Sequence, residues 1–418
     1  MRPASLANIG FLLKKTGAGM VGRGRESWLR AKGGKSESKV SFIELFFDLV
    51  FVFSISQLSH ALAGHFTPLG ALEAIMLVFA VWWVWVFTAW VTNWLDPERM
   101  PVRIMLLVLM FAGLVLSASI PDAFGEKAIF FAGAYVFMQV GRSLFAAYVL
   151  RGVNPGNYRN FLRISSWLIL SGIFWIAGAI LGGEAQVVLW LVALVIEYAS
   201  PALGFRVPGL GKSTIEDWDV SGAHLAERCA LFIIICLGEA VLLAGKTFAE
   251  EPLSLLMIAV FIIAFVGTVV MWWIYFQFGH ERAAHRIEHD DMPGGLARQA
   301  FTYAHILILA GIILSVVGDE FLFSHARDQA DLHTAAAILG GPAVFLIGNL
   351  WFKGATTGRP PLSHLGGLAG LALLLLTLPM VVVYQLGILA TAVLIVVAIW
   401  EYASLSRAVP LARPPGHH

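Results

Sequence analysis

The chain contains a series of apolar stretches, each about 20 residues long, and this feature limits its fold more than any other. A helix needs about 20 mostly apolar residues to cross the hydrocarbon core of a bilayer. Of the 418 residues, 58% are hydrophobic and only 13% are charged, whereas soluble domains have about 25% charged residues. So few charges cannot cover a water-facing surface. The sequence therefore predicts an all-α polytopic membrane protein.

Twelve transmembrane helices are expected, joined by loops too short to form a soluble domain. They are predicted at 42–62, 71–94, 102–121, 128–150, 161–182, 186–204, 222–245, 253–278, 299–318, 333–353, 363–384 and 386–406. The acidic string "DEFLFSHARDQAD" is expected to form the outer loop after the ninth helix. The expected organisation is a basic tail at 1–40, a six-helix repeat at 41–204, a linker at 205–221, a second six-helix repeat at 222–406 and a tail at 407–418.

The basic residues indicate which way the helices face, because Lys and Arg concentrate in cytoplasmic loops. With both termini cytoplasmic, only Lys127, Lys246 and Arg327 of the 28 basic residues fall outside. The tail at 1–40 is rich in Lys and Arg, so we expect it to lie along anionic lipid or to be disordered. The sequence thus predicts a multi-pass protein with both ends in the cytoplasm.

The two halves of the chain resemble each other helix by helix. "EYAS" occurs at 197–200 and again at 401–404, and "LMFAGLVLS", ending at Ser117, matches "LILAGIILS", ending at Ser315. "VWWVWVF" from Val81 matches "MWWIYFQ" from Met271, and the first helices place Glu44 opposite Glu227. Because each half has six helices, we expect two parallel repeats related by a pseudo-two-fold axis along the membrane normal.

Several acidic and basic residues near the cytoplasmic helix ends are interpreted as a helix clamp. An ionisable group at membrane depth usually faces a partner, a bundle interior or water. Acids at these ends are expected to pair with bases there and to hold helices together. The clamp candidates are Glu44, Glu227, Arg228, Arg142, Glu197, Glu401, Arg103 and Arg298.

Two acids lie deeper. Asp48 is about 6 Å beyond Glu44 along its helix, and Glu239 is about 18 Å beyond Glu227. No base occurs at their depth in the sequence, so each is a candidate proton relay or cation site, with a structural role left open. Gln57, Ser56 and Ser54 are the candidate neutral contacts to a solute.

Other classes of protein find little support. The net charge of +1 gives no indication of nucleic acid binding, and "PGLGKST" lacks the first glycine of a phosphate loop. His285 and His289 have a metal-like spacing, but the neighbouring Arg282 and Arg286 repel a cation. No nucleophile and base have a recognisable spacing. We therefore expect neither an enzyme, a cofactor nor a metal site, and a homodimer is left open.

The string "ELFFDLVFVFSISQLSHAL" resembles the signature of the bacterial low temperature requirement A family, and "HLAERCALFIIICLGEAV" resembles that family's second characteristic segment. The resemblance extends from about residue 38 to residue 405. It implies a bacterial cytoplasmic (inner) membrane protein, and it supplies no transport substrate. A distant likeness to six-helix-repeat potassium channels rests only on Phe46 and Asp48.

Three hypotheses follow. The first is a secondary, proton-coupled transporter of an unknown small solute or ion, with Asp48 and Glu239 in the coupling site. The second is a cation channel with a two-repeat, six-helix fold. The third is a structural or assembly factor, linked to growth in the cold, whose polar residues only pack helices.

Overall fold

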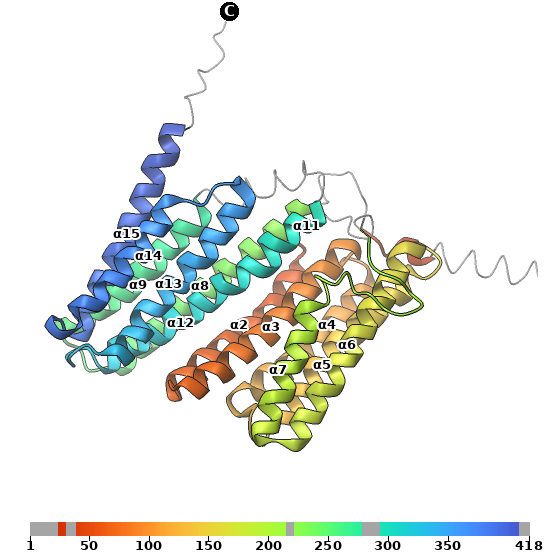
Figure 1. Ribbon diagram of the computed structural model, residues 1–418, viewed down its shortest axis with the longest axis horizontal. Coiled ribbons are helices and arrows are strands. Elements are labelled where there is room, and N and C mark those ends of the chain that lie inside the picture. Colours follow the sequence, from red (N-terminus) through yellow and green to blue (C-terminus); the bar gives the residue numbers. More distant parts are fainter. Residues whose placement is uncertain (1–23, 31–38, 215–220, 278–292, 409–418) are drawn as a thin grey trace, which may run out of the picture. The chain divides into compact units, whose positions relative to one another are not determined.

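The computed structural model describes residues 24–30, 39–214, 221–277 and 293–408, and these residues are almost entirely helical (Figure 1). The transmembrane-length helices of the first half are α2 (Phe42–Gly64), α3 (Pro68–Trp94), α4 (Met100–Ser119), α5 (Ala128–Leu150) and α6 (Pro155–Leu181), followed by α7 (Gly183–Ala199). Those of the second half are α8 (Gly222–Glu250), α9 (Leu255–Phe276), α12 (His305–Ser324), α13 (Leu332–Thr357) and α15 (Val383–Ala408). Helix α14 (Leu362–Leu374) has 13 residues and continues into the 3-10 helix η4 (Leu375–Met380), and together they form a span of 19 residues.

Eleven helices in the described residues are long and apolar enough to cross a membrane. They correspond to eleven of the twelve predicted spans. The remaining prediction, 186–204, corresponds to α7, which has 17 residues and measures about 26 Å at 1.5 Å per residue. That length is slightly short of a hydrocarbon core of about 30 Å. The multi-pass helical fold is thus confirmed, and the twelfth span stays a prediction.

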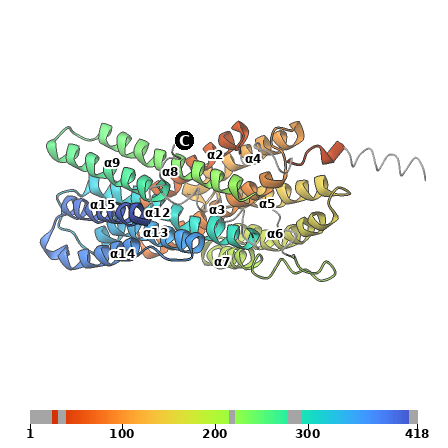
Figure 2. The same cartoon turned by 90° about the horizontal axis from the view of Figure 1, so that it is seen from above.

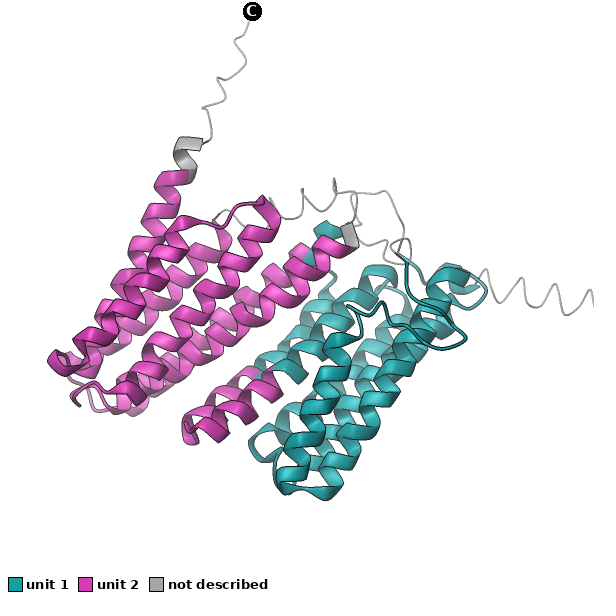
Figure 3. Cartoon of the chain, in the orientation of Figure 1, with its two compact units in different colours: residues 1–54, 79–225 teal, residues 55–78, 226–418 magenta. Residues whose placement is uncertain are grey.

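The chain divides into two compact units (Figure 3). Unit 1 comprises residues 1–54 and 79–225, and unit 2 comprises residues 55–78 and 226–418. The division falls inside α2, α3 and α8, so each of these helices contributes one part to each unit. Compactness and internal sequence similarity are different properties, and the two-repeat arrangement stays a prediction.

Aromatic side chains form the core of unit 1. Helix α5 packs against α4 and α6, and α6 packs against α7. Trp175 of α6 and Trp190 of α7 are fully buried, with ring centroids 4.9 Å apart, and Phe131 of α5 stacks on Trp190 at 5.4 Å. Large flat rings fill the space between helices with little loss of side-chain freedom. The polar groups described below are therefore held in a rigid setting.

Glycines bring α12 and α13 of unit 2 into backbone contact. A Cβ atom on Gly311 would lie 2.4 Å from the Phe345 backbone nitrogen, and one on Gly341 would lie 2.4 Å from the Ser315 nitrogen. Small residues allow such close packing between membrane helices. Helix α15 packs against α9, α13 and α14, and it lies between α9 and α14 in Figure 2.

The ninth helix differs from its prediction at both ends. It begins with a short helix, α11 (Pro293–Ala297), and a π-helical segment, η3 (Arg298–Ala304), which lead directly into α12. The ring of His305 contacts the Ala300 carbonyl at 2.7 Å and the Tyr275 hydroxyl at 2.8 Å, so its two nitrogens are satisfied beside the widened turn.

At its other end α12 continues to Ser324, so Asp319 lies inside the helix and not in the predicted outer loop. The apolar run from Phe321 to Phe323 explains the extension, because it gives the last turn a buried face.

We expect Gly311→Ala to destabilise the protein by about 1–3 kcal/mol, because the added methyl group forces apart two packed backbones. Thermal unfolding in detergent measures the change. Gly245→Ala is the matched control, because a Cβ at that helical position of unit 2 meets nothing within 4 Å. Equal stability of the two variants would contradict this account of the α12–α13 contact.

Candidate functional site

Asp48 lies on α2 in unit 1, and its side chain is fully buried. The indole Nε1–H of Trp85, on α3, donates a hydrogen bond of 2.8 Å to Asp48 Oδ1. Trp85 is itself fully buried and stacks on Trp82 at 5.0 Å. A hydrogen bond to a charged group contributes about 1.5–3 kcal/mol. Asp48 is therefore oriented by a rigid aromatic donor on the neighbouring helix.

Ser54 belongs to a helix contact within the same unit. Its hydroxyl oxygen lies 2.5 Å from that of Ser117 on α4, and Ser117 Oγ donates to the Gly113 carbonyl at 2.7 Å. Both serines are fully buried. Ser54 thus joins α2 to α4, and whether it also contacts a solute stays a prediction.

Glu239 and Ser56 meet in unit 2, where the predicted site residues are brought together most directly. The hydroxyl of Ser56, on α2, donates a hydrogen bond to Glu239 Oε1, on α8. Glu239 is partly buried and forms no ion pair with any residue that the structure describes. Gln57 is also partly buried, on the same part of α2. Asp48 is counted in unit 1, so it is described separately from this pair.

Glu44 forms the centre of a buried cluster in unit 1. The backbone N–H and the hydroxyl of Ser41 each donate to Glu44 Oε2 at 2.9 Å. Arg30 Nη2 lies 3.3 Å from the same oxygen, and His224 Nε2 lies 3.1 Å from Oε1. Both Glu44 and His224 are fully buried. The carboxylate is therefore surrounded by donors, as the clamp interpretation requires.

His224 joins Asn93 to the Glu44 cluster. Asn93 Oδ1 accepts from the Ser221 N–H at 2.8 Å, so its Nδ2 is the group that faces His224 Nδ1 at 3.3 Å. His224 Nε2 lies 3.1 Å from Glu44 Oε1 and 3.1 Å from Arg30 Nη2, so this nitrogen either donates to the carboxylate or accepts from the guanidinium. His224 was not among the predicted site residues. The signal for it was its place as the first residue of the "HLAER" string.

Glu197 on α7 accepts hydrogen bonds at both of its oxygens. Ser171 Oγ and Trp175 Nε1, both on α6, donate to Oε1 at 2.7 and 3.0 Å. The Tyr135 hydroxyl and Gln139 Nε2, both on α5, donate to Oε2. Glu197 is thus a buried junction of three helices.

Arg142 joins the same network through Gln139. Arg142 Nη2 donates to Gln139 Oε1, while Nη1 donates at 2.9 Å to the Val84 carbonyl and to the Thr88 hydroxyl on α3. Arg142 is fully buried. It therefore links α3 to α5 and reaches the carboxylate of Glu197 through an amide.

Glu401 of unit 2 pairs directly with a base. Lys353 Nζ, on α13, donates to the two carboxylate oxygens of Glu401, on α15, at 2.7 and 2.8 Å, and to the Ile274 carbonyl at 2.7 Å. Both charged side chains are less than one tenth exposed. Sequence reasoning missed Lys353, because it counted this residue only as a cytoplasmic charge at a helix end.

The other clamp candidates have different surroundings. Arg103 pairs with Glu98 at 2.7 Å, a surface contact outside the predicted set. Arg228 is fully buried and Glu227 is partly buried, both on α8, and Arg298 begins the π-helical segment. His285, His289 and most of the tails lie outside the described residues. Within the described residues no group of three or more His, Cys, Asp or Glu side chains could hold a metal ion.

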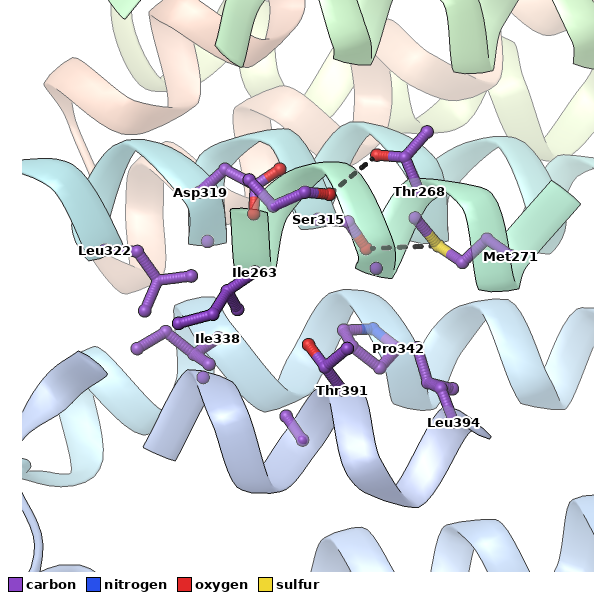
Figure 4. Close-up of a pocket in the computed structure, with 15 residues that line it drawn as sticks. Ile263, Thr268, Met271, Ser315, Asp319, Leu322, Ile338, Pro342, Thr391 and Leu394 are labelled. Carbon is purple, nitrogen blue, oxygen red and sulfur yellow. Dashed lines mark hydrogen bonds between the residues drawn. The ribbon is translucent and has the colours of Figure 1, made fainter. Parts of the chain in front are cut away.

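A pocket in unit 2 contains an acid that sequence reasoning placed in a loop. It lies between α9, α12, α13 and α15, and Asp319 is its acidic residue (Figure 4). Thr268, Ser315 and Thr391 supply hydroxyl groups, and the remaining lining is apolar or glycine. The sequence signal for the position of Asp319 was the apolar run "FLF" shortly after it, because this run extends the helix beyond Asp319.

The family model of the bacterial low temperature requirement A protein (LtrA) matches residues 39–399, which include the Asp48, Glu44 and Glu239 sites. The chain belongs to the LtrA family. A relative in Rhizobium meliloti (strain 1021), named Uncharacterized protein RA0937, is 43% identical over 389 residues, which are 93% of this chain and 94% of the relative. No solved structure matches the chain.

We expect Lys353→Met to lower the stability of this LtrA protein by about 3–5 kcal/mol, because Glu401 is then left as an unpaired buried charge. The double variant Lys353→Met/Glu401→Leu should recover most of that loss, because the charge is removed with its partner. Unfolding in detergent, analysed as a double-mutant cycle, measures both effects.

Lys127→Met is the control for this cycle, because Lys127 is exposed and its loss should change stability by less than about 0.5 kcal/mol. A double variant as unstable as the sum of its single variants would mean that the two side chains are not coupled.

Proposed function

We propose that this LtrA-family protein is a secondary, proton-coupled transporter of a small solute, with Asp48 and Glu239 as its coupling acids. The observation that carries the proposal is the surroundings of Glu239. Its contact is the neutral hydroxyl of Ser56, whereas Glu401 contacts Lys353 and Glu44 contacts Arg30. The deep acid is thus not neutralised by a salt bridge within the described residues.

The physical argument is the cost of a charge in hydrocarbon. A carboxylate at the centre of a membrane helix costs about 2.5–3.5 kcal/mol on insertion scales. Taking up a proton removes that cost, and so does a cation or a water-filled path. A carboxylate with a hydroxyl neighbour keeps its hydrogen bond in either protonation state, because the hydroxyl can donate or accept. Glu239 and Ser56 are therefore suited to exchange a proton without losing their contact.

A two-repeat scaffold in a bacterial inner membrane, with both termini cytoplasmic, completes the proposal. Glu197 and Glu401, which occupy the repeated "EYAS" strings, each contact the fourth helix of their own half. The strings "MQVGRSLF" at 138–145 and "FLIGNLWF" at 345–352 on those helices share a glycine and a phenylalanine at equivalent positions. The distribution of Lys and Arg supports the orientation. We further propose a carrier and not an enzyme.

The test is proton movement into proteoliposomes under an imposed K⁺-valinomycin potential, with candidate solutes screened outside. We expect solute-dependent proton uptake by the wild type. Asp48→Asn and Glu239→Gln should reduce it by about 100-fold or more, because a neutral amide cannot carry the proton. Glu73→Gln, at a partly buried acid on α3, is the matched control and should retain uptake.

If Glu239→Gln and Asp48→Asn take up protons at the wild-type rate, neither residue is a coupling acid. A solute-independent current in bilayer recordings would contradict a carrier and favour a channel, because a channel passes ions far faster than a carrier turns over.

A further inference from the structure

The pocket at Asp319 is a small space enclosed by helices of unit 2. Its volume is about 40 Å³, and it is lined by four helices of that unit. Gly267, Gly318 and Gly387 contribute no side chain to it. A Cβ on Gly318 would lie 2.8 Å from the Ala337 carbonyl oxygen, a backbone atom, so this wall admits no larger residue without rearrangement. The space is thus small and shaped by packed backbone.

Asp319 places a carboxylate in this space without a counter-charge. The residue lies five positions before the end of α12, about 8 Å along the helix from its last residue. It is partly buried, and the structure gives its carboxylate neither a hydrogen bond nor an ion pair within the described residues. The neighbouring acid, Glu320, faces elsewhere and lies 4.0 Å from His60.

Hydroxyl oxygens from three helices complete the polar lining (Figure 4). Thr268 on α9 donates its hydrogen to the Ala264 carbonyl at 3.1 Å, and Ser315 on α12 donates to the Gly311 carbonyl at 2.8 Å. Each hydroxyl has one hydrogen and two lone pairs. Ser315 Oγ also lies 3.7 Å from the Met271 sulfur on α9. Because each hydroxyl hydrogen is directed at an acceptor within the protein, the oxygen lone pairs remain available as ligands. Thr391, on α15, adds a third hydroxyl.

This combination fits a particular ligand. Carboxylate and hydroxyl oxygens are hard ligands that suit alkali and alkaline-earth cations. A single carboxylate balances a single positive charge, whereas a divalent ion would leave an uncompensated charge in a low-dielectric setting. The volume admits an ion with about one or two water molecules and excludes an organic solute of any size.

We infer that the Asp319 pocket binds one partly dehydrated monovalent metal cation of the size of Na⁺. Asp319 supplies the charge, and Thr268, Ser315 and Thr391 supply neutral oxygens. The inference concerns binding and holds whether or not the protein transports protons through Glu239. It adds a cation site to unit 2 that is separate from the Glu239–Ser56 pair.

The experiment is thermal unfolding of the purified full-length protein in detergent at fixed pH and ionic strength, with NaCl replacing choline chloride. Binding to the folded state raises the melting temperature in a saturable way. We expect such a rise for the wild type and its loss in Asp319→Asn. Glu320→Gln, which changes the adjacent acid, and Glu239→Gln should both keep the rise.

A second variant tests the site even if Asp319→Asn does not fold. Thr268→Val/Thr391→Val keeps the carboxylate and removes two neutral ligands, and it should weaken the apparent Na⁺ affinity by about tenfold or more, which equals about 1.4 kcal/mol. Direct binding of radioactive ²²Na⁺ to the same samples should give the same order of affinities.

Three results would overturn the inference. The first is a melting temperature that is the same in NaCl, KCl, LiCl and choline chloride, which would mean that no alkali cation binds. The second is a sodium response unchanged in both the Asp319 and the threonine variants, which would place the cation elsewhere. The third is a wild-type melting temperature that changes with pH through Asp319 and does not change with salt, which would make the residue a protonation site.

Glu239→Gln is expected to stop proton uptake and to keep the sodium-dependent rise in melting temperature. The two measurements therefore test the transport proposal and the cation site separately.

Discussion

A charge inside a hydrocarbon layer must be compensated close by, and the arrangement of polar groups in this LtrA protein follows from that requirement. Glu44 and Glu197 each accept hydrogen bonds from donors on at least two segments, and Glu401 accepts from Lys353 on α13. Each carboxylate therefore fixes the approach of the elements that supply its donors. Removing one partner leaves the other buried and uncompensated, which is more costly than removing both. These groups constrain the packing more than they add to its stability.

The aromatic and glycine-rich contacts act on a different property, the distance between helices. Large rings separate α6 and α7 by filling the space, as Trp175 and Trp190 do. Glycines bring α12 and α13 together until their backbones touch, as at Gly311 and Gly341. The close approach at one side of α12 helps to fix where Asp319 sits on its other turns, since a helix rotated by one residue would move every side chain by about 100°.

The sequence was sufficient for the class of fold and for the buried acids on α2, because a long apolar run that contains Glu44 and Asp48 is typical of a membrane helix with one face inside a bundle. The sequence did not predict which side chains the buried acids contact. His224 is far from Glu44 along the chain, and Lys353 is far from Glu401, so pairing them requires knowing which helices pack together. Asp319 was misplaced for a local reason. Two adjacent acids indicate a loop, and only the buried face of the next turn shows that the helix continues.

The predicted repeat helps to separate acids that pack helices from acids that bind a ligand or a proton. Both halves keep a glutamate at the "EYAS" string and contact it from their fourth helix, although the base is Arg142 in one half and Lys353, one turn further along, in the other. A helix contact that each half needs is expected to recur in both halves.

Asp48 and Asp319 do not recur in this way. When the matching strings of the two halves are aligned in sequence, the position of Asp48 corresponds to Leu231 and that of Asp319 to Pro121. An acid needed only to pack helices should recur with the packing. An acid present in one half alone, with a neutral neighbour or a small polar pocket, is better explained by a ligand or a proton that binds to that half.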